Sequence, residues 1–128
     1  MARSSSNQPT EVELQILRIL WDQGPSIARQ IHDSLQTFKQ TTYSTTVKML
    51  SVMLGKGLVK RDESVSPQVY RAAVTRDVAG KRLVKDLVEK VYDGAAATLV
   101  LHALRAGKSS AEDLAEIRKL LDEMEGRS

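Results

Sequence analysis

The hydrophobic period of this chain changes at Gly57, and that change constrains the fold more than any other feature. Before Gly57, apolar residues recur every three or four positions in three successive segments, which is the spacing of amphipathic helices. After it come two short runs, LVKRD and QVYRA, whose Val and Tyr content favours β-strands, separated by the turn-rich segment ESVSP. We therefore expect three helices followed by a β-hairpin.

Three helices and a hairpin in this order are typical of a winged helix, in which the second and third helices form a helix-turn-helix and the hairpin is the wing. Thr10 and Glu13 have the spacing of a capping box at the start of the first helix, and Gly24 with Pro25 marks its end. The expected apolar stripes are Leu14, Leu17 and Trp21 in the first helix, Ile27, Ile31 and Leu35 in the second, and Val47, Leu50 and Leu54 in the third.

The residues after Ala73 predict a second, purely helical region. Three segments between residues 75 and 128 carry apolar stripes, with Gly94 as a helix stop and Ser109 and Ser110 as helix caps. A region of this size cannot bury so much apolar surface by itself, and a second copy of the chain would cover it in a two-fold dimer. The residues expected in that interface are Leu87, Val91, Leu99, Val100, Leu104, Leu114, Ile117 and Leu121.

The sequence therefore predicts a mainly α protein in three parts. A disordered tail occupies residues 1–9, and a winged helix-turn-helix domain with a small β-hairpin wing occupies residues 10–74. A three-helix dimerisation region occupies residues 75–128.

Basic residues are concentrated in the first half of the chain, although the net charge is only +3. Residues 1–74 contain nine Lys or Arg against six Asp or Glu, whereas residues 75–128 contain ten of each kind. Within the first half, the segment 39–71 has six basic residues against Asp62 and Glu63. A local surplus of this kind suits a nucleic-acid partner, and it also suits an ordinary solvated face.

The third predicted helix has two faces that differ in residue type. If its apolar stripe points into the domain, then Ser44, Thr45, Lys48 and Ser51 lie on or near the outer side. A recognition helix meets base edges with its amino-terminal residues, where Ser and Thr hydroxyls bond to several bases and Lys reaches guanine or phosphate. Hydroxyl residues at a helix start are also ordinary caps, so both interpretations of Ser44 and Thr45 stay open.

The composition excludes several classes of function. The chain has no cysteine, which excludes disulfides, thiolate metal sites and cysteine nucleophiles. Its two histidines, His32 and His102, lie in no motif of metal ligands or of a catalytic triad, and there is no glycine-rich phosphate loop. We therefore expect no enzyme activity, no cofactor and no metal. Without a signal peptide or a bilayer-spanning apolar run, a cytoplasmic protein with no membrane insertion is expected.

Five segments of the chain match one known family in their order and spacing. They are EVELQILRILWDQGPSIARQI, YSTTVKMLSVMLGKGLVKRDE, VYRAAVTRD, KVYDGAAATLVLHAL and SAEDLAEIRKLLDE. The match that they carry extends over roughly residues 10–125. This arrangement resembles the penicillinase-repressor (BlaI/MecI-like) family of bacterial transcription factors. The resemblance implies a homodimer that binds a two-fold symmetric operator and represses transcription, with an N-terminal winged helix and a C-terminal helical dimerisation region.

On this resemblance, the recognition helix corresponds to residues 43–56. Thr46 departs from relatives that often carry an aliphatic residue there, so its methyl and not its hydroxyl is expected to matter. Val52 stands where some relatives have Arg, so one phosphate contact is expected to be missing. The residues expected to contact DNA are Thr42, Tyr43, Ser44, Thr45, Thr46, Lys48, Ser51 and Lys56, with Lys60 and Arg61 in the wing.

The resemblance also implies an inducing signal that releases the repressor. In staphylococcal relatives a membrane-bound sensor leads to cleavage in the dimerisation helices between an Asn and a Phe, and the matching positions here are His102 and Ala103. Neither residue type is kept, so that cleavage specificity does not carry over. A protease, a membrane sensor pathway and a different signal are all candidates. A cysteine-based copper sensor, as in other relatives, is excluded because the chain has no cysteine.

Two other functions fit the same fold. One is a small-molecule-sensing winged-helix regulator whose C-terminal helices form the ligand pocket, and an aromatic content of only 4% speaks against it. The other is a winged-helix protein-interaction module without DNA affinity, and the basic surplus speaks against that.

Overall fold

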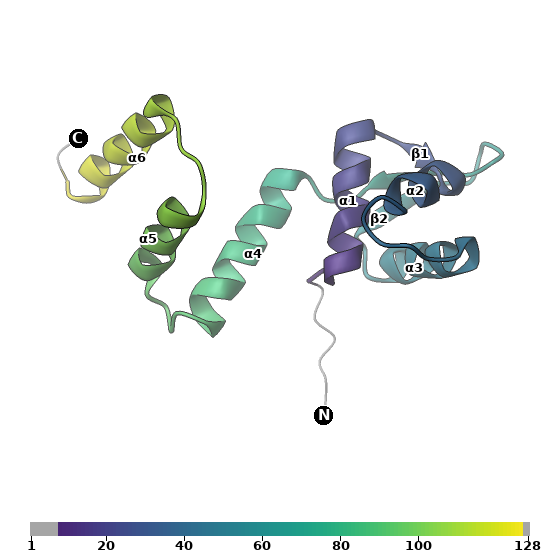
Figure 1. The fold of residues 1–128 in the computed structure, drawn as a ribbon, viewed down its shortest axis with the longest axis horizontal. Coiled ribbons are helices and arrows are strands. Elements are labelled where there is room, and N and C mark those ends of the chain that lie inside the picture. Colours follow the sequence, from purple (N-terminus) through teal and green to yellow (C-terminus); the bar gives the residue numbers. More distant parts are fainter. Residues whose placement is uncertain (1–7, 127–128) are drawn as a thin grey trace. The chain divides into compact units, whose positions relative to one another are not determined.

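The computed structural model describes residues 8–126 and confirms the predicted fold class, a mainly helical protein with a winged helix-turn-helix. The predicted tail, residues 1–9, lies mostly outside the described residues. The elements follow one another as α1 (Glu11–Gln23), β1 (Ser26–Ile27), α2 (Ala28–Leu35), α3 (Tyr43–Gly55), β2 (Val59–Asp62), β3 (Val69–Ala72), α4 (Arg76–Lys90), α5 (Ala96–Ala106) and α6 (Ala111–Met124) (Figure 1).

The chain forms two compact units, an N-terminal unit that runs to Leu83 and a C-terminal unit that begins at Val84. The division falls inside α4, whose first half belongs to the N-terminal unit. The predicted domain boundary between residues 74 and 75 lies just before α4 and stays a prediction.

The N-terminal unit has a single apolar core to which α1, α2, α3 and the strands all contribute. Removing one large apolar side chain from water into such a core contributes about 1.5–3 kcal/mol to stability. Figure 1 shows the three helices gathered around the small sheet. The buried core residues are Ile16, Leu17, Leu20, Ile31, Leu35, Leu50, Met53, Leu58, Val59 and Tyr70.

The start of α1 is fixed by the predicted capping box. The Glu13 amide donates to Thr10 Oγ1 at 3.2 Å, and the Thr10 amide donates to Glu13 Oε1 at 3.0 Å. Two amides that α1 itself cannot satisfy are bonded in this way. Glu13 is only 5% exposed, which makes it a buried carboxylate as well as a cap.

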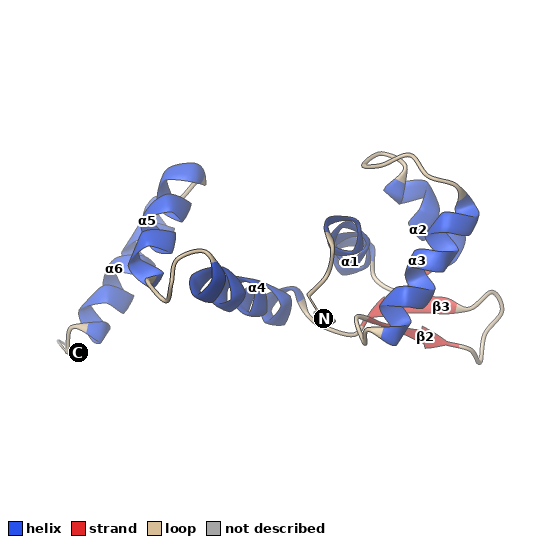
Figure 2. Ribbon diagram, turned by 90° about the horizontal axis from the view of Figure 1, so that it is seen from below, coloured by secondary structure: helices blue, strands red, loops and turns tan. Residues whose placement is uncertain are grey.

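The hairpin predicted after α3 is present, and a third strand extends it. β2 pairs with β3 in antiparallel fashion, and β1 pairs with the other edge of β3, giving the order β1-β3-β2. β1 has two residues, which is too short for an alternating pattern to reveal it in the sequence. Figure 2 shows the loop between β2 and β3 projecting beyond the strands as the tip of the wing.

Trp21 joins α1 to the chain that enters α4. Its indole Nε1–H donates to the carbonyl oxygen of Val74 at 2.9 Å. The Arg76 guanidinium pairs with the Asp22 carboxylate at 2.7 Å and lies 5.4 Å from the Trp21 ring centroid. Trp21 is therefore at the edge of the core, where its polar atom has a partner, and not in the centre of the stripe.

The C-terminal unit has no buried residue anywhere between residues 84 and 126. Its helix boundaries follow the predicted signals: Gly94 adopts φ 85°, and the Ser110 hydroxyl accepts from the Asp113 amide at 3.0 Å. Helices with apolar stripes that one chain leaves in water have no core of their own. Among residues 8–126, none of the helices combines the length and the apolar character that a bilayer crossing requires.

Candidate nucleic-acid interface

Hydroxyl-bearing side chains surround the start of α3 and bond to one another. Thr42 is the N-cap, and its Oγ1 accepts from the Thr45 amide at 3.2 Å. The same oxygen lies 2.9 Å from Thr45 Oγ1 and 3.2 Å from Ser44 Oγ. All three hydroxyl residues are exposed. Capping and an exposed polar face therefore coexist, because one hydroxyl caps the helix while its neighbours stay accessible to solvent.

The inward face of α3 differs from the predicted stripe by a rotation of about one residue. The buried residues are Thr46, Leu50 and Met53, whereas Val47 is 37% exposed. The prediction that Val47 anchors α3 was therefore wrong. Leu54 lies only at the margin of the core. Both sets have helical spacing, so periodicity could not decide between them.

Thr46 is fully buried and cannot contact DNA in this fold. Its Oγ1 lies 2.8 Å from His32 Nδ1 and donates to the Thr42 carbonyl oxygen at 3.4 Å. The predictions that Thr46 meets DNA, and that its methyl matters and its hydroxyl does not, are corrected here. The hydroxyl ties α3 to α2, which is the reason a polar residue is tolerated in the core.

Replacing Thr46 with valine should lower the free energy of unfolding by about 1 kcal/mol, because the shape is kept while the hydroxyl bonds are lost. Urea unfolding measures the change. Stability equal to wild type would contradict the role given to the hydroxyl.

The outward face of α3 combines small polar, apolar and basic side chains. Ser44, Lys48 and Ser51 lie at helical spacing along it, as predicted, and Val47 joins them. Lys48 takes part in none of the ion pairs found among residues 8–126. An exposed cation beside hydroxyls and one methyl-bearing residue is the kind of surface that reads a major groove.

Tyr43, the first residue of α3, contacts two side chains of α2. Its ring meets the His32 ring edge-on, with centroids 5.5 Å apart at 88°. The guanidinium carbon of Arg29 lies 4.0 Å from the Tyr43 ring centroid. Arg29 was absent from the predicted site, because an arginine early in α2 carries no local signal that it will meet the start of α3.

Lys56 follows the last residue of α3 and pairs with a carboxylate of α1. Its Nζ lies 2.7 Å from Glu13 Oε1, and the two side chains are 25% and 7% exposed. The residue thus neutralises a buried carboxylate of α1. The DNA contact of Lys56 stays a prediction, and the ion pair with Glu13 competes with it.

The two wing residues predicted to meet DNA point to opposite faces of the sheet. Arg61 lies opposite the buried Tyr70, and Lys60 lies opposite the exposed Arg71. Because side chains alternate along a strand, only Arg61 shares the face that packs on the helices. Hydrogen bonds with the Glu63 carboxylate, at 2.8 Å, and with Tyr70 raise the pKa of Arg61 above its ordinary value.

The wing tip carries one further fixed carboxylate. Bonds from the Ser64 hydroxyl, at 2.6 Å, and from the Ser64 amide, at 2.9 Å, lower the pKa of Asp62. Asp62 therefore stays ionised, and the charge of Arg71 also lowers its pKa. Within the described part of the chain, no three His, Cys, Asp or Glu side chains gather as metal ligands.

The residues predicted at a dimer interface are open to solvent in the single chain. Leu99, Leu104 and Ile117 are half-buried, and the other five are exposed: Leu87, Val91, Val100, Leu114 and Leu121. The candidate cleavage residues His102 and Ala103 are also exposed and lie within the helical part of α5. His102 Nδ1 lies 3.0 Å from the Tyr92 hydroxyl, which gives this histidine a structural partner.

Comparison with known proteins matches residues 9–123 to the model of the penicillinase repressor family. A penicillinase repressor of Staphylococcus aureus is 21% identical in an alignment 122 residues long, which covers 93% of this chain and 97% of that protein. The methicillin resistance regulatory protein MecI of Staphylococcus aureus strain N315 is 22% identical over 88% of this chain and 92% of its own. The MecI protein of Staphylococcus epidermidis matches to the same extent.

Proposed function

Because the chain belongs to the penicillinase repressor family, a family of transcriptional repressors, we propose that it is a homodimer that binds operator DNA through the outward face of α3. The observation that carries the proposal is the division of α3 into two faces. Leu50 and Met53 are fully buried in the domain, while Ser44, Lys48 and Ser51 are exposed, and none of the ion pairs among residues 8–126 involves Lys48.

The outward face of α3 supplies the contacts that distinguish sequences. Lys48 reaches a guanine or a phosphate, the exposed hydroxyls bond to base edges, and Val47 touches a thymine methyl. The wing contributes a phosphate contact through Arg61, which leaves its ion pair with Glu63 to make it. Contacts with the DNA phosphate backbone carry no sequence information, but they fix the position of the recognition helix in the groove.

Dimerisation completes the function, because one winged helix makes a small interface that depends on phosphate contacts. A second copy covers the exposed stripes of α4, α5 and α6, and it places two recognition helices on one DNA duplex. The second helix then binds at a high effective concentration. An inducing signal needs only to separate the two copies. Proteolysis near His102 and Ala103 is one such signal, and it requires α5 to unwind locally.

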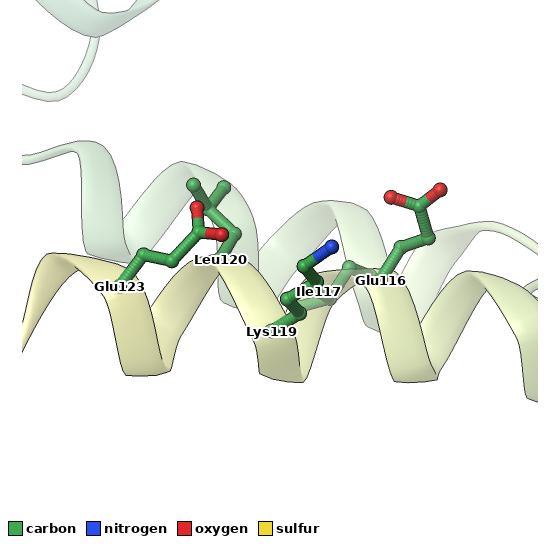
Figure 3. Close-up of a pocket in the computed structure, with 5 residues that line it drawn as sticks. All are labelled: Glu116, Ile117, Lys119, Leu120 and Glu123. Atoms are coloured by element: carbon green, nitrogen blue, oxygen red, sulfur yellow. The ribbon is translucent and has the colours of Figure 1, made fainter. Parts of the chain in front are cut away.

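A small-molecule-sensing function receives little support. A surface hollow of about 410 Å³ in the C-terminal unit is lined by Glu116, Ile117, Lys119, Leu120 and Glu123, all on the single helix α6 (Figure 3). One helix cannot enclose a ligand, whereas small-molecule sites bury most of their ligand. The alternative is a protein-interaction module without DNA affinity. DNA binding by the wild type in the following experiment would exclude it.

Replacing Lys48 with alanine should lower operator affinity about 10- to 100-fold, because a dimer loses two contacts at the groove. A fluorescence titration with duplex from the region upstream of the protein's own gene measures it. Thermal stability should stay close to wild type, since the side chain is exposed. Lys119→Ala, which removes the same charge from α6, is the control. Equal affinity of the Lys48 variant and the control would overturn the assignment of α3.

A further inference from the structure

Arg29 is an exposed arginine with an unusual placement. It is the second residue of α2, and the first turn of that helix contains no acidic residue. The amino end of a helix carries partial positive charge, so a guanidinium there is electrostatically unfavourable unless an anion binds nearby. The ion pairs found among residues 8–126 do not include Arg29.

The Arg29 side chain is nevertheless held in one place. Its guanidinium carbon lies 4.0 Å from the centroid of the Tyr43 ring, and that ring is itself supported edge-on by His32. A cation held over a ring face is attracted by the π electrons and makes no hydrogen bond in doing so. The contact therefore orients Arg29 without consuming its hydrogen bonds.

The surroundings of Arg29 join the three elements that a winged helix presents to DNA. A groove of about 310 Å³ runs between the start of α2, the start of α3 and the wing. All of these elements lie in the N-terminal unit. The residues that line the groove are Ile27, Ala28, Arg29, Tyr43, Val47, Pro67, Gln68 and Tyr70.

We propose that Arg29 binds a phosphate of the DNA backbone beside the recognition helix, and that Tyr43 is the residue that positions it. The inference rests on the proposed function and adds a contact to it. A phosphate suits the site because the guanidinium fork matches its oxygens, and because its charge offsets both Arg29 and the amino end of α2. Arg29 then fixes the register of α3 in the groove.

The test compares Arg29→Ala with Arg18→Ala, which removes the same charge from an exposed position on α1. Both variants and wild type are titrated against operator duplex and against unrelated duplex at several salt concentrations. Loss of two phosphate contacts per dimer should reduce the salt slope, log K against log salt, by about 1.8. Affinity at low salt should fall about tenfold or more on both duplexes, and Arg18→Ala should match wild type.

Two further variants separate a phosphate contact from a structural role. Arg29→Lys keeps a cation that reaches the phosphate, and it should restore most of the salt slope. Tyr43→Ala removes the platform and should lower affinity while most of the slope remains, because Arg29 keeps its charge. Circular dichroism and thermal unfolding show whether each variant is folded.

The outcomes are distinct. If wild type binds no DNA, the proposed function itself fails. If wild type binds but Arg29→Ala keeps the slope and affinity of Arg18→Ala, only the phosphate contact is overturned. A loss confined to operator duplex would also overturn it, because a phosphate contact does not distinguish sequences.

Discussion

Replacing Leu121 with aspartate should convert the protein into a monomer and lower its operator affinity about 10²- to 10⁴-fold. Leu121 is 51% exposed and lies on the same stripe of α6 as Leu114 and Ile117. If a second copy covers this stripe, the variant must bury two carboxylates without partners, which costs far more than the lost apolar contact. Light scattering should give the protomer mass of 14.2 kDa, and wild type twice that value.

Ala115→Asp is the matched control for this experiment. It adds the same charge to α6, at an exposed position next to the stripe and not on it. It should remain a dimer and bind DNA like wild type. Helix content from circular dichroism must be equal in all three proteins, and Leu114→Asp provides a second disruption. If both leucine variants have the mass of a dimer, the apolar stripe of α6 does not lie in the dimer interface.

Replacing Lys56 with alanine should lower the free energy of unfolding by about 2–3 kcal/mol, although sequence reasoning assigned this residue to DNA binding. The change leaves the Glu13 carboxylate, 7% exposed, without the ammonium group that lies 2.7 Å away. The remaining bond from the Thr10 amide does not neutralise the charge. Urea unfolding at a fixed protomer concentration gives the value, since dimer stability depends on concentration.

A double-mutant cycle isolates the ion pair. Glu13→Gln removes the charge that needs neutralising, so adding Lys56→Ala to it should cost much less than Lys56→Ala alone. Lys48→Ala gives the opposite pattern, with weaker DNA binding and little change in stability. Wild-type stability for Lys56→Ala, or simple additivity in the cycle, would contradict the structural role of Lys56.

Much of the helical architecture was predictable because its signals are local. The capping box at Thr10, the glycine stop at Gly57 and the cap at Ser110 each act within one turn of helix. The Gly57 amide donates to the Leu54 carbonyl oxygen at 3.1 Å, and Gly57 adopts φ 76°, which glycine accepts without strain. β1 was missed because its two residues are a strand only through their pairing with β3.

The errors in the candidate site share one cause, which is that burial depends on partners distant in the sequence. Thr46 is polar by composition, yet it is buried because His32 of α2 satisfies its hydroxyl. Lys56 reads as a free cation, yet Glu13 lies beside it, 43 positions earlier in the chain. Arg29 carries no motif, and its importance arises only from its contact with Tyr43.

By itself, the sequence determined the winged helix-turn-helix fold, the exposed character of Ser44, Lys48 and Ser51, and the need of the C-terminal stripes for cover. These follow from hydrophobic period and capping, which nearest neighbours along the chain decide. Only the tertiary structure decided which face of α3 is buried, which basic residues form ion pairs, and which face of the sheet packs on the helices. Those properties depend on side chains that pack across elements, and a periodic pattern that is equally good for Val47 or Thr46 cannot choose between them.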